Sequence, residues 1–217
     1  MPYYFKNYKK TFVYYLCPKN GCTSIANMLI QADGNIKLLD EEADNENGKE
    51  FKSTHHLADP TTNEDWAPCE AKIKLAVKRD PVERFISGFK NRILYHKDLI
   101  KTTHWLTGKF ENLTSHLPEV PSMDTFIENF DTYWLNPWVA EHFQTQTHYL
   151  NKPNDYTHIF DVSELDEVRK LLEELSGKTI VLPYLQAGGN NRYLRFNREK
   201  INWIKEKYAI DYKNGWC

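Results

Sequence analysis

The chain has 217 residues, of which 41% are hydrophobic, 14% aromatic and 27% charged, and its formal net charge is −2. This length and composition are typical of a globular protein with one substantial core, so we expect residues 1–217 to form a single domain. The hydrophobic content argues against a disordered chain, and the nearly balanced charge argues against a protein that coats nucleic acid. Any anion-binding site must therefore be a local feature.

The first predicted elements are a strand over residues 11–16 and a helix that begins near Thr23. The strand is rich in β-branched and aromatic residues, and apolar residues recur at helical spacing after Thr23. A helix N-terminus presents backbone N–H groups and the positive end of the helix dipole, and a lysine adds a full positive charge. The connection between the two elements therefore predicts a phosphate-binding loop. Its residues are Pro18, Lys19, Asn20, Gly21, Cys22, Thr23 and Ser24.

This loop differs from the common nucleotide-binding loop G-x-x-x-x-G-K-[ST]. That motif places lysine after its second glycine, whereas Lys19 precedes Gly21 here and no other glycine is near. An ordinary ATP or GTP loop is therefore disfavoured. The remaining alternative to phosphate binding is a simple strand-to-helix turn with an exposed lysine.

A second strand-to-helix segment follows a polar, acidic stretch at residues 33–52, which we interpret as a solvated loop. Residues 72–79 alternate polar and apolar side chains before Asp80 and Pro81, as a strand ending in a turn does. A helix is predicted from Val82 onward, because apolar residues recur on one face. Arg79 offers a planar fork of donors suited to phosphate, and Ser87 offers a neutral hydroxyl.

The remaining elements complete an alternation of strands and helices. We expect a serine-capped helix over residues 122–130, a strand over 156–161, a helix over 163–175 capped by Ser163 and stopped by Gly177, and a closing helix over 201–212. This order predicts an α/β fold with a central parallel sheet flanked by helices. In such folds ligands bind at the carboxyl ends of the strands.

The two strand-to-helix segments resemble the cofactor motifs of sulfotransferases that use 3′-phosphoadenosine 5′-phosphosulfate (PAPS). Residues 18–25 resemble the 5′-phosphosulfate loop, and residues 77–89 resemble the 3′-phosphate motif, in particular those of the Golgi-type carbohydrate enzymes of sulfotransferase family 2 and their bacterial relatives. The resemblance implies that Arg79 and Ser87 hold the 3′-phosphate and that a late loop containing Arg192 covers the nucleotide. It also implies sulfuryl transfer to a hydroxyl of a carbohydrate acceptor, with PAP as product, Lys19 stabilising the departing phosphate and no metal.

The resemblance further implies a base between the two motifs. His55 and His56 lie there, and histidine titrates near neutrality, as a base for a hydroxyl group requires. In an extended segment the two side chains point to opposite sides, so only one can face a given cleft. A rough alignment favours His56 over His55. The carboxylates of Glu64, Asp65 and Glu70 remain alternatives.

Members of the resembling family also place a histidine and a glutamine in a later aromatic segment. His142, with Gln144 or Gln146, is therefore expected near the cleft. Two other function classes stay open from the sequence: an ATP-dependent small-molecule kinase with Asp80 as metal ligand, and a noncatalytic protein of the same fold that binds glycans or nucleotides.

Two further features bear on location. Residues 1–10 lack the apolar core of a signal peptide, and no stretch approaches the roughly 20 apolar residues of a membrane span. The four cysteines show no C-x-x-C motif or paired framework, which favours reduced thiols. We therefore expect a soluble cytoplasmic protein without membrane or nucleic-acid partners, either of bacterial or phage type or lacking the membrane anchor that its Golgi relatives carry. The sequence does not indicate an oligomeric state.

Overall fold

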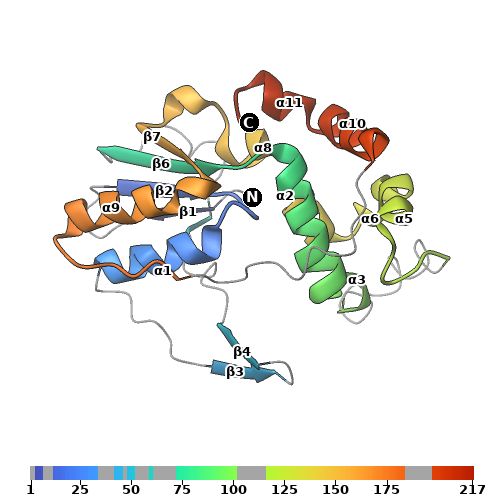
Figure 1. Cartoon of the computed structure of the whole chain (residues 1–217), viewed down its shortest axis with the longest axis horizontal. Helices are drawn as coiled ribbons and strands as arrows, with labels where there is room; N and C mark the ends of the chain where they lie inside the picture. The colour runs from blue at the N-terminus through green and yellow to red at the C-terminus, as the bar shows by residue number, and fades with distance from the viewer. Residues whose placement is uncertain are drawn as a thin grey trace. The chain divides into compact units, whose positions relative to one another are not determined.

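The structure is a computed structural model that describes residues 3–6, 12–33, 42–45, 48–51, 59–60, 72–101, 116–183 and 197–217. The chain divides into two compact units. The first unit comprises Met1–Arg79 and Gln146–Gln186, and the second comprises Asp80–Thr145 and Ala187–Cys217. Figure 1 labels the helices and strands of both.

The first unit is built on a five-stranded sheet. In order across the sheet, its strands are β5 (Asp59–Pro60), β1 (Tyr3–Lys6), β2 (Phe12–Leu16), β6 (Ile73–Lys78) and β7 (His158–Asp161). Strands β2, β6 and β7 run parallel, which confirms the predicted parallel sheet, while β1 runs antiparallel to both of its neighbours. The carboxyl ends of β2, β6 and β7 therefore lie at the same edge of the sheet.

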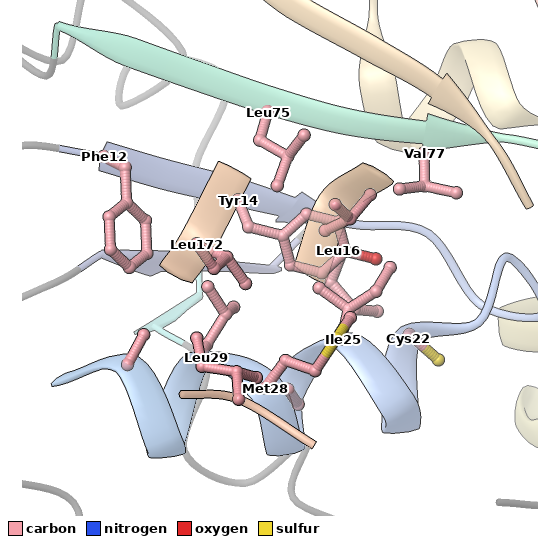
Figure 2. Close-up of a cluster of buried hydrophobic side chains, with 14 residues drawn as sticks. Phe12, Tyr14, Leu16, Cys22, Ile25, Met28, Leu29, Leu75, Val77 and Leu172 are labelled. Atoms are coloured by element: carbon pink, nitrogen blue, oxygen red, sulfur yellow. The ribbon is translucent and has the colours of Figure 1, made fainter. Parts of the chain in front are cut away.

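Helices α1 (Cys22–Asp33) and α9 (Leu165–Ser176) pack on one face of this sheet and contact each other. Alternate residues of β2 and β6 point toward them, because successive side chains of a strand face opposite sides. Figure 2 shows Tyr14, Leu16 and Val77 pointing toward Ile25 and Met28 of α1. This cluster is the hydrophobic core of the unit.

The intervening residues of the same strands are buried as well. Val13 and Ala76 are fully buried on the opposite face, as expected for parallel strands covered on both sides. Helix α8 (Gln146–Leu150) contacts β2. The ring of Tyr15 meets that of Tyr156 edge-on with centroids 5.4 Å apart, and the Tyr156 hydroxyl donates to the carbonyl oxygen of Leu150 at 2.8 Å. The sheet is thus closed to solvent around its middle strands.

The acidic segment predicted as a solvated loop contains a two-stranded antiparallel sheet. Strand β3 (Glu42–Asn45) pairs with β4 (Gly48–Phe51), with Glu42 opposite Phe51. The interpretation of residues 33–52 as a solvated loop or mobile flap did not include this pairing. Backbone groups carry the pairing of strands, so acidic side chains conceal this hairpin from an analysis based on apolar alternation.

Two terminal signals of α9 were predicted, and one is corrected. Gly177 ends the helix in the left-handed conformation with φ 67°, as predicted. The N-terminal cap is Asp161 rather than Ser163: the Asp161 carboxylate accepts from the Ser163 N–H at 2.9 Å and from its hydroxyl at 2.7 Å. Glu164 returns a bond to the Asp161 N–H, which completes a capping box ahead of the short 3₁₀ turn Val162–Glu164. A second 3₁₀ turn, Pro153–Asp155, precedes β7.

The second unit is helical. Helix α2 (Pro81–Gly88) continues directly as a π-helix, η2 (Phe89–Tyr95). The other helices are α3 (Asp98–Lys101), α5 (Met123–Glu128), α6 (Phe130–Tyr133), α7 (Pro137–Phe143), α10 (Arg198–Lys207) and α11 (Ala209–Lys213). Their core is dominated by aromatic rings, with Phe85 in contact with Phe126, Phe130 and Phe143.

Side chains cap four of the described helices of the second unit, namely α2, α5, α7 and α10. Ser122 accepts from the Thr125 N–H at 3.1 Å, which confirms the serine cap of α5. Asp80 caps α2 by accepting from the N–H groups of Val82 at 2.9 Å and Glu83 at 3.1 Å. Across the described parts of both units, every helix is too short or too polar to cross a membrane.

Candidate phosphate-binding site

The loop after β2 begins with a tight turn. The Asn20 N–H donates to the Cys17 carbonyl oxygen at 3.2 Å, with Pro18 in the second position and Lys19 in the third. Lys19 adopts φ 72°, a left-handed conformation that glycine tolerates and side-chain-bearing residues disfavour. Lys19 therefore occupies the position of this turn whose positive φ glycine adopts with the least strain. Backbone strain of this kind concentrates at functional sites.

Gly21 joins the turn to α1. Its carbonyl oxygen accepts the first helical bond, from the Ile25 N–H at 3.0 Å, so Gly21 is the N-cap and Cys22, Thr23 and Ser24 form the first turn. The N–H groups of a first turn have no intrahelical acceptor, and they point out of the helix end. Gly21 has φ 74°, and a Cβ there would lie 3.1 Å from Leu165 Cδ1. The backbone conformation therefore favours glycine, and a Cβ at this position would require the Leu165 side chain to shift by a few tenths of an ångström.

The side chains of the first turn differ in their surroundings. Cys22 belongs to the hydrophobic core, which explains its burial. The Ser24 hydroxyl donates to the carbonyl oxygen of Pro183 at 2.9 Å, so its proton is engaged by the protein. Thr23 is also buried, and its carbonyl oxygen accepts from Asn27 Nδ2 at 2.9 Å. The backbone N–H groups and Lys19 thus carry more of the loop's capacity to bind an anion than the Ser24 hydroxyl does.

Arg79 follows β6 and lies against this loop. Its Nη1 atom donates to the carbonyl oxygen of Lys19 at 3.2 Å. The parallel pairing of β2 and β6 accounts for the proximity, since both chains leave the sheet at the same edge. The structure therefore brings together the Pro18–Ser24 loop and Arg79, which are far apart in the sequence.

A buried amide, Gln146, also links the two segments. Gln146 Oε1 accepts from Asn20 Nδ2 at 2.7 Å and from the Arg79 N–H at 3.0 Å, and Gln146 Nε2 donates to the Arg79 carbonyl oxygen at 2.8 Å. Asn20 Nδ2 donates in addition to the Val77 carbonyl oxygen at 2.7 Å. Asn20 and Gln146 are both 0% exposed. The sequence indicated Gln144 or Gln146 near a cleft. It does not indicate these hydrogen bonds of Gln146, because Asn20 and Arg79 are 126 and 67 positions away.

The loop rests on an apolar base. Burial raises the pKa of Tyr14 well above its usual value, and the neighbouring Cys22 and Cys17 raise it further. Burial raises the pKa of Tyr156 on the other face of the sheet as well. These phenols stay neutral at physiological pH, so they add no negative charge beneath the loop.

Several other predicted residues lie in the second unit. Ser87 is half-buried on α2, and its assignment to a 3′-phosphate stays a prediction. His142 is buried, with Nδ1 within 2.8 Å of the Trp138 carbonyl oxygen. The Gln144 carbonyl oxygen accepts from Nη1 of Arg84, which is almost completely buried, at 2.6 Å. Arg84 therefore has a structural role within the second unit.

Three predicted site residues, His55, His56 and Arg192, lie outside the described residues, as do the alternative bases Glu64, Asp65 and Glu70. The structure describes every other predicted residue of the site.

The donor set fits a phosphorylated ligand. Lys19, Arg79 and the first turn of α1 supply positive charge and N–H donors at one edge of the sheet. The Oδ1 atom of Asn20 is buried and has no hydrogen-bond partner among the described residues, and it lies outside this donor set.

Comparison with known proteins agrees with this chemistry. A model of the sulfotransferase family matches residues 2–212, which include both strand-to-helix segments. Among curated proteins and among solved structures, none matches the chain significantly. Because the match extends over nearly the whole sequence, the chain belongs to the sulfotransferase family.

Proposed function

We propose that this sulfotransferase uses PAPS as donor and transfers its sulfuryl group to a hydroxyl, that of a carbohydrate acceptor. The observation that carries the proposal is the contact between the two predicted phosphate motifs, in which Arg79 Nη1 lies 3.2 Å from the Lys19 carbonyl oxygen. PAPS carries phosphate on both the 5′ and 3′ positions of its ribose. Two neighbouring anion-binding segments, the Lys19 loop and the segment with Arg79, suit a ligand with two such groups.

On the 5′ side, the relevant groups are Lys19 and the N–H groups at the start of α1. When bound, PAPS supplies a sulfuryl group that passes from an oxygen of its 5′-phosphate to the acceptor oxygen. Negative charge then accumulates on that phosphate. Lys19 and the helix N-terminus would stabilise this charge, and the turn and the first helical bond fix the backbone that carries them.

On the 3′ side, Arg79 offers a planar guanidinium with several donors, of which Nη1 donates to the Lys19 carbonyl oxygen. We assign Arg79 and Ser87 to the 3′-phosphate, and Arg192 to the loop that covers the nucleotide. The support for Ser87 and Arg192 is the sequence motif and the family match.

The acceptor needs a base. We propose His56, with His55 as the alternative, to take the hydroxyl proton as the oxygen–sulfur bond forms; PAP leaves with the electron pair of the broken bond. Imidazole suits this role because its pKa lies near neutrality. No metal is assigned a part in the reaction.

We also propose that the two compact units belong to one sulfotransferase domain, because the family match runs from residue 2 to residue 212 without interruption. A cytoplasmic location is proposed from the cysteine pattern of the sequence.

The kinase alternative is less well supported. It needs a carboxylate at the end of β6 for a metal ion, and Asp80 is the residue there. Asp80 Oδ1 accepts from two N–H groups of α2, and Asp80 Oδ2 lies 3.4 Å from the Tyr212 hydroxyl. The carboxylate is thus committed to capping.

Transfer of labelled sulfate from PAPS to a panel of glycans tests the proposal. Lys19→Ala and Arg79→Ala should each lower turnover by about 10²–10³-fold, the usual cost of a lost transition-state donor. Lys178→Ala, which removes an exposed lysine from the end of α9, is the matched control and should leave turnover unchanged. Full turnover by both site variants would contradict the site. Separate substitution of His56 and of His55 by alanine shows which of the two supplies the base, since only that variant should lose turnover.

A further inference from the structure

Resting on the proposed function, we infer that Gln146 is a positioning residue that holds the two phosphate-binding segments in register. It contacts no predicted ligand group itself. Its terminal amide binds Asn20 of the first segment and both backbone groups of Arg79 in the second.

The pattern of donors and acceptors leaves only one arrangement of this network. Asn20 faces the Val77 carbonyl oxygen at 2.7 Å, and a carbonyl can only accept, so the Asn20 atom there is the nitrogen. The same nitrogen faces Gln146, so the Gln146 atom must be the oxygen. The Gln146 nitrogen is then left facing the Arg79 carbonyl oxygen, where a donor is required. Each bond therefore fixes the next.

Gln146 acts on Arg79 as a neighbouring strand would. Its amide satisfies the N–H and the carbonyl of Arg79 together, and so extends the pairing of β6 one residue beyond its end at Lys78. This fixes the backbone from which the guanidinium reaches the Lys19 carbonyl. Through Asn20, the same amide holds the residue that follows the strained Lys19.

Burial makes the network sensitive to substitution. Asn20 and Gln146 are 0% exposed, so water cannot replace a lost partner without rearrangement. Gln146→Met keeps the length of the side chain and removes its three hydrogen bonds, one to Asn20 and two to the backbone of Arg79.

Calorimetric titration with PAP and with AMP, which lacks the 3′-phosphate, tests the inference. We expect Gln146→Met to raise the Kd for PAP by about tenfold or more and to reduce the preference for PAP over AMP, since Arg79 is displaced from the 3′ side. Leu172→Ala, a core substitution of α9, is the control for lost stability and should leave both the Kd and the preference within about twofold of the wild type.

The outcomes separate the inference from the function on which it rests. Wild-type protein that fails to bind PAP contradicts the proposed function. Wild-type protein that binds PAP, with Gln146→Met binding equally well and with the same preference, overturns the positioning role. Hydrogen exchange of the ligand-free protein decides the role independently: the Asn20 and Gly21 N–H groups should exchange faster in Gln146→Met but not in Leu172→Ala, and equal exchange in both variants overturns it.

Discussion

Lys19→Gly separates the binding role of the lysine from its effect on the fold. Lys19 has φ 72° in a turn closed by the 3.2 Å bond from Asn20 to Cys17. A left-handed conformation costs a residue with a side chain about 1–2 kcal/mol, whereas glycine adopts it freely. Glycine in turn adds about 0.5–1 kcal/mol of unfolded-chain entropy. The free energy of unfolding should therefore stay unchanged or rise by about 1 kcal/mol.

The same substitution removes the ammonium group from the loop. PAPS turnover should fall by about 10²–10³-fold. Urea unfolding measures the stability, and labelled-sulfate transfer measures the turnover. Lys19→Ala is the matched variant: it loses the same charge but keeps the strained conformation, so it should be the less stable of the two. A Lys19→Gly protein that is clearly destabilised would refute the argument from backbone strain, and one that keeps full turnover would refute the role of the lysine.

Two further substitutions test the architecture around the loop, both by urea unfolding. Gly21→Ala should destabilise by about 1–3 kcal/mol, because φ is 74° and the new Cβ would lie 3.1 Å from Leu165 Cδ1. Gly177→Ala is the control for backbone conformation alone, because Gly177 has φ 67° and nothing lies within 4 Å of the new Cβ. It should lower the free energy of unfolding by less than Gly21→Ala does, and an equal loss would show that the Leu165 contact is unimportant. Asp80→Ala should cost about 0.5–2 kcal/mol through loss of the α2 cap, and Asp80→Asn much less. Equal losses in the two Asp80 variants would instead attribute the effect to charge, including the contact with Tyr212.

The sequence predicted the parts of the fold that local patterns determine. The run of β-branched and aromatic residues before Pro18 became β2, and the alternation of polar and apolar residues before Asp80 became β6. The left-handed Gly177 ends α9 as expected. Parallel pairing then brought Arg79 to the Lys19 loop, as the rule for carboxyl strand ends predicts.

What escaped prediction depends on contacts between distant residues or on backbone pairing. The β3–β4 hairpin lies in an acidic stretch with no apolar alternation. The hydrogen bonds from Gln146 to Asn20 and Arg79 could not be predicted, because a buried glutamine has the same sequence signature as one that lines a cleft. The predicted Ser163 cap is replaced by Asp161, which caps the 3₁₀ turn ahead of α9, because its carboxylate accepts from both the N–H and the hydroxyl of Ser163.

Our central claim is that the Lys19 loop and Arg79 form one site for a nucleotide with both 5′- and 3′-phosphates. Calorimetric titration of the wild-type protein with PAP, AMP and ATP with magnesium tests this claim directly. We predict that PAP binds at least about tenfold more tightly than AMP, and that ATP binds more weakly than PAP. Equal affinity for PAP and AMP, or preferential binding of ATP with magnesium, would contradict it.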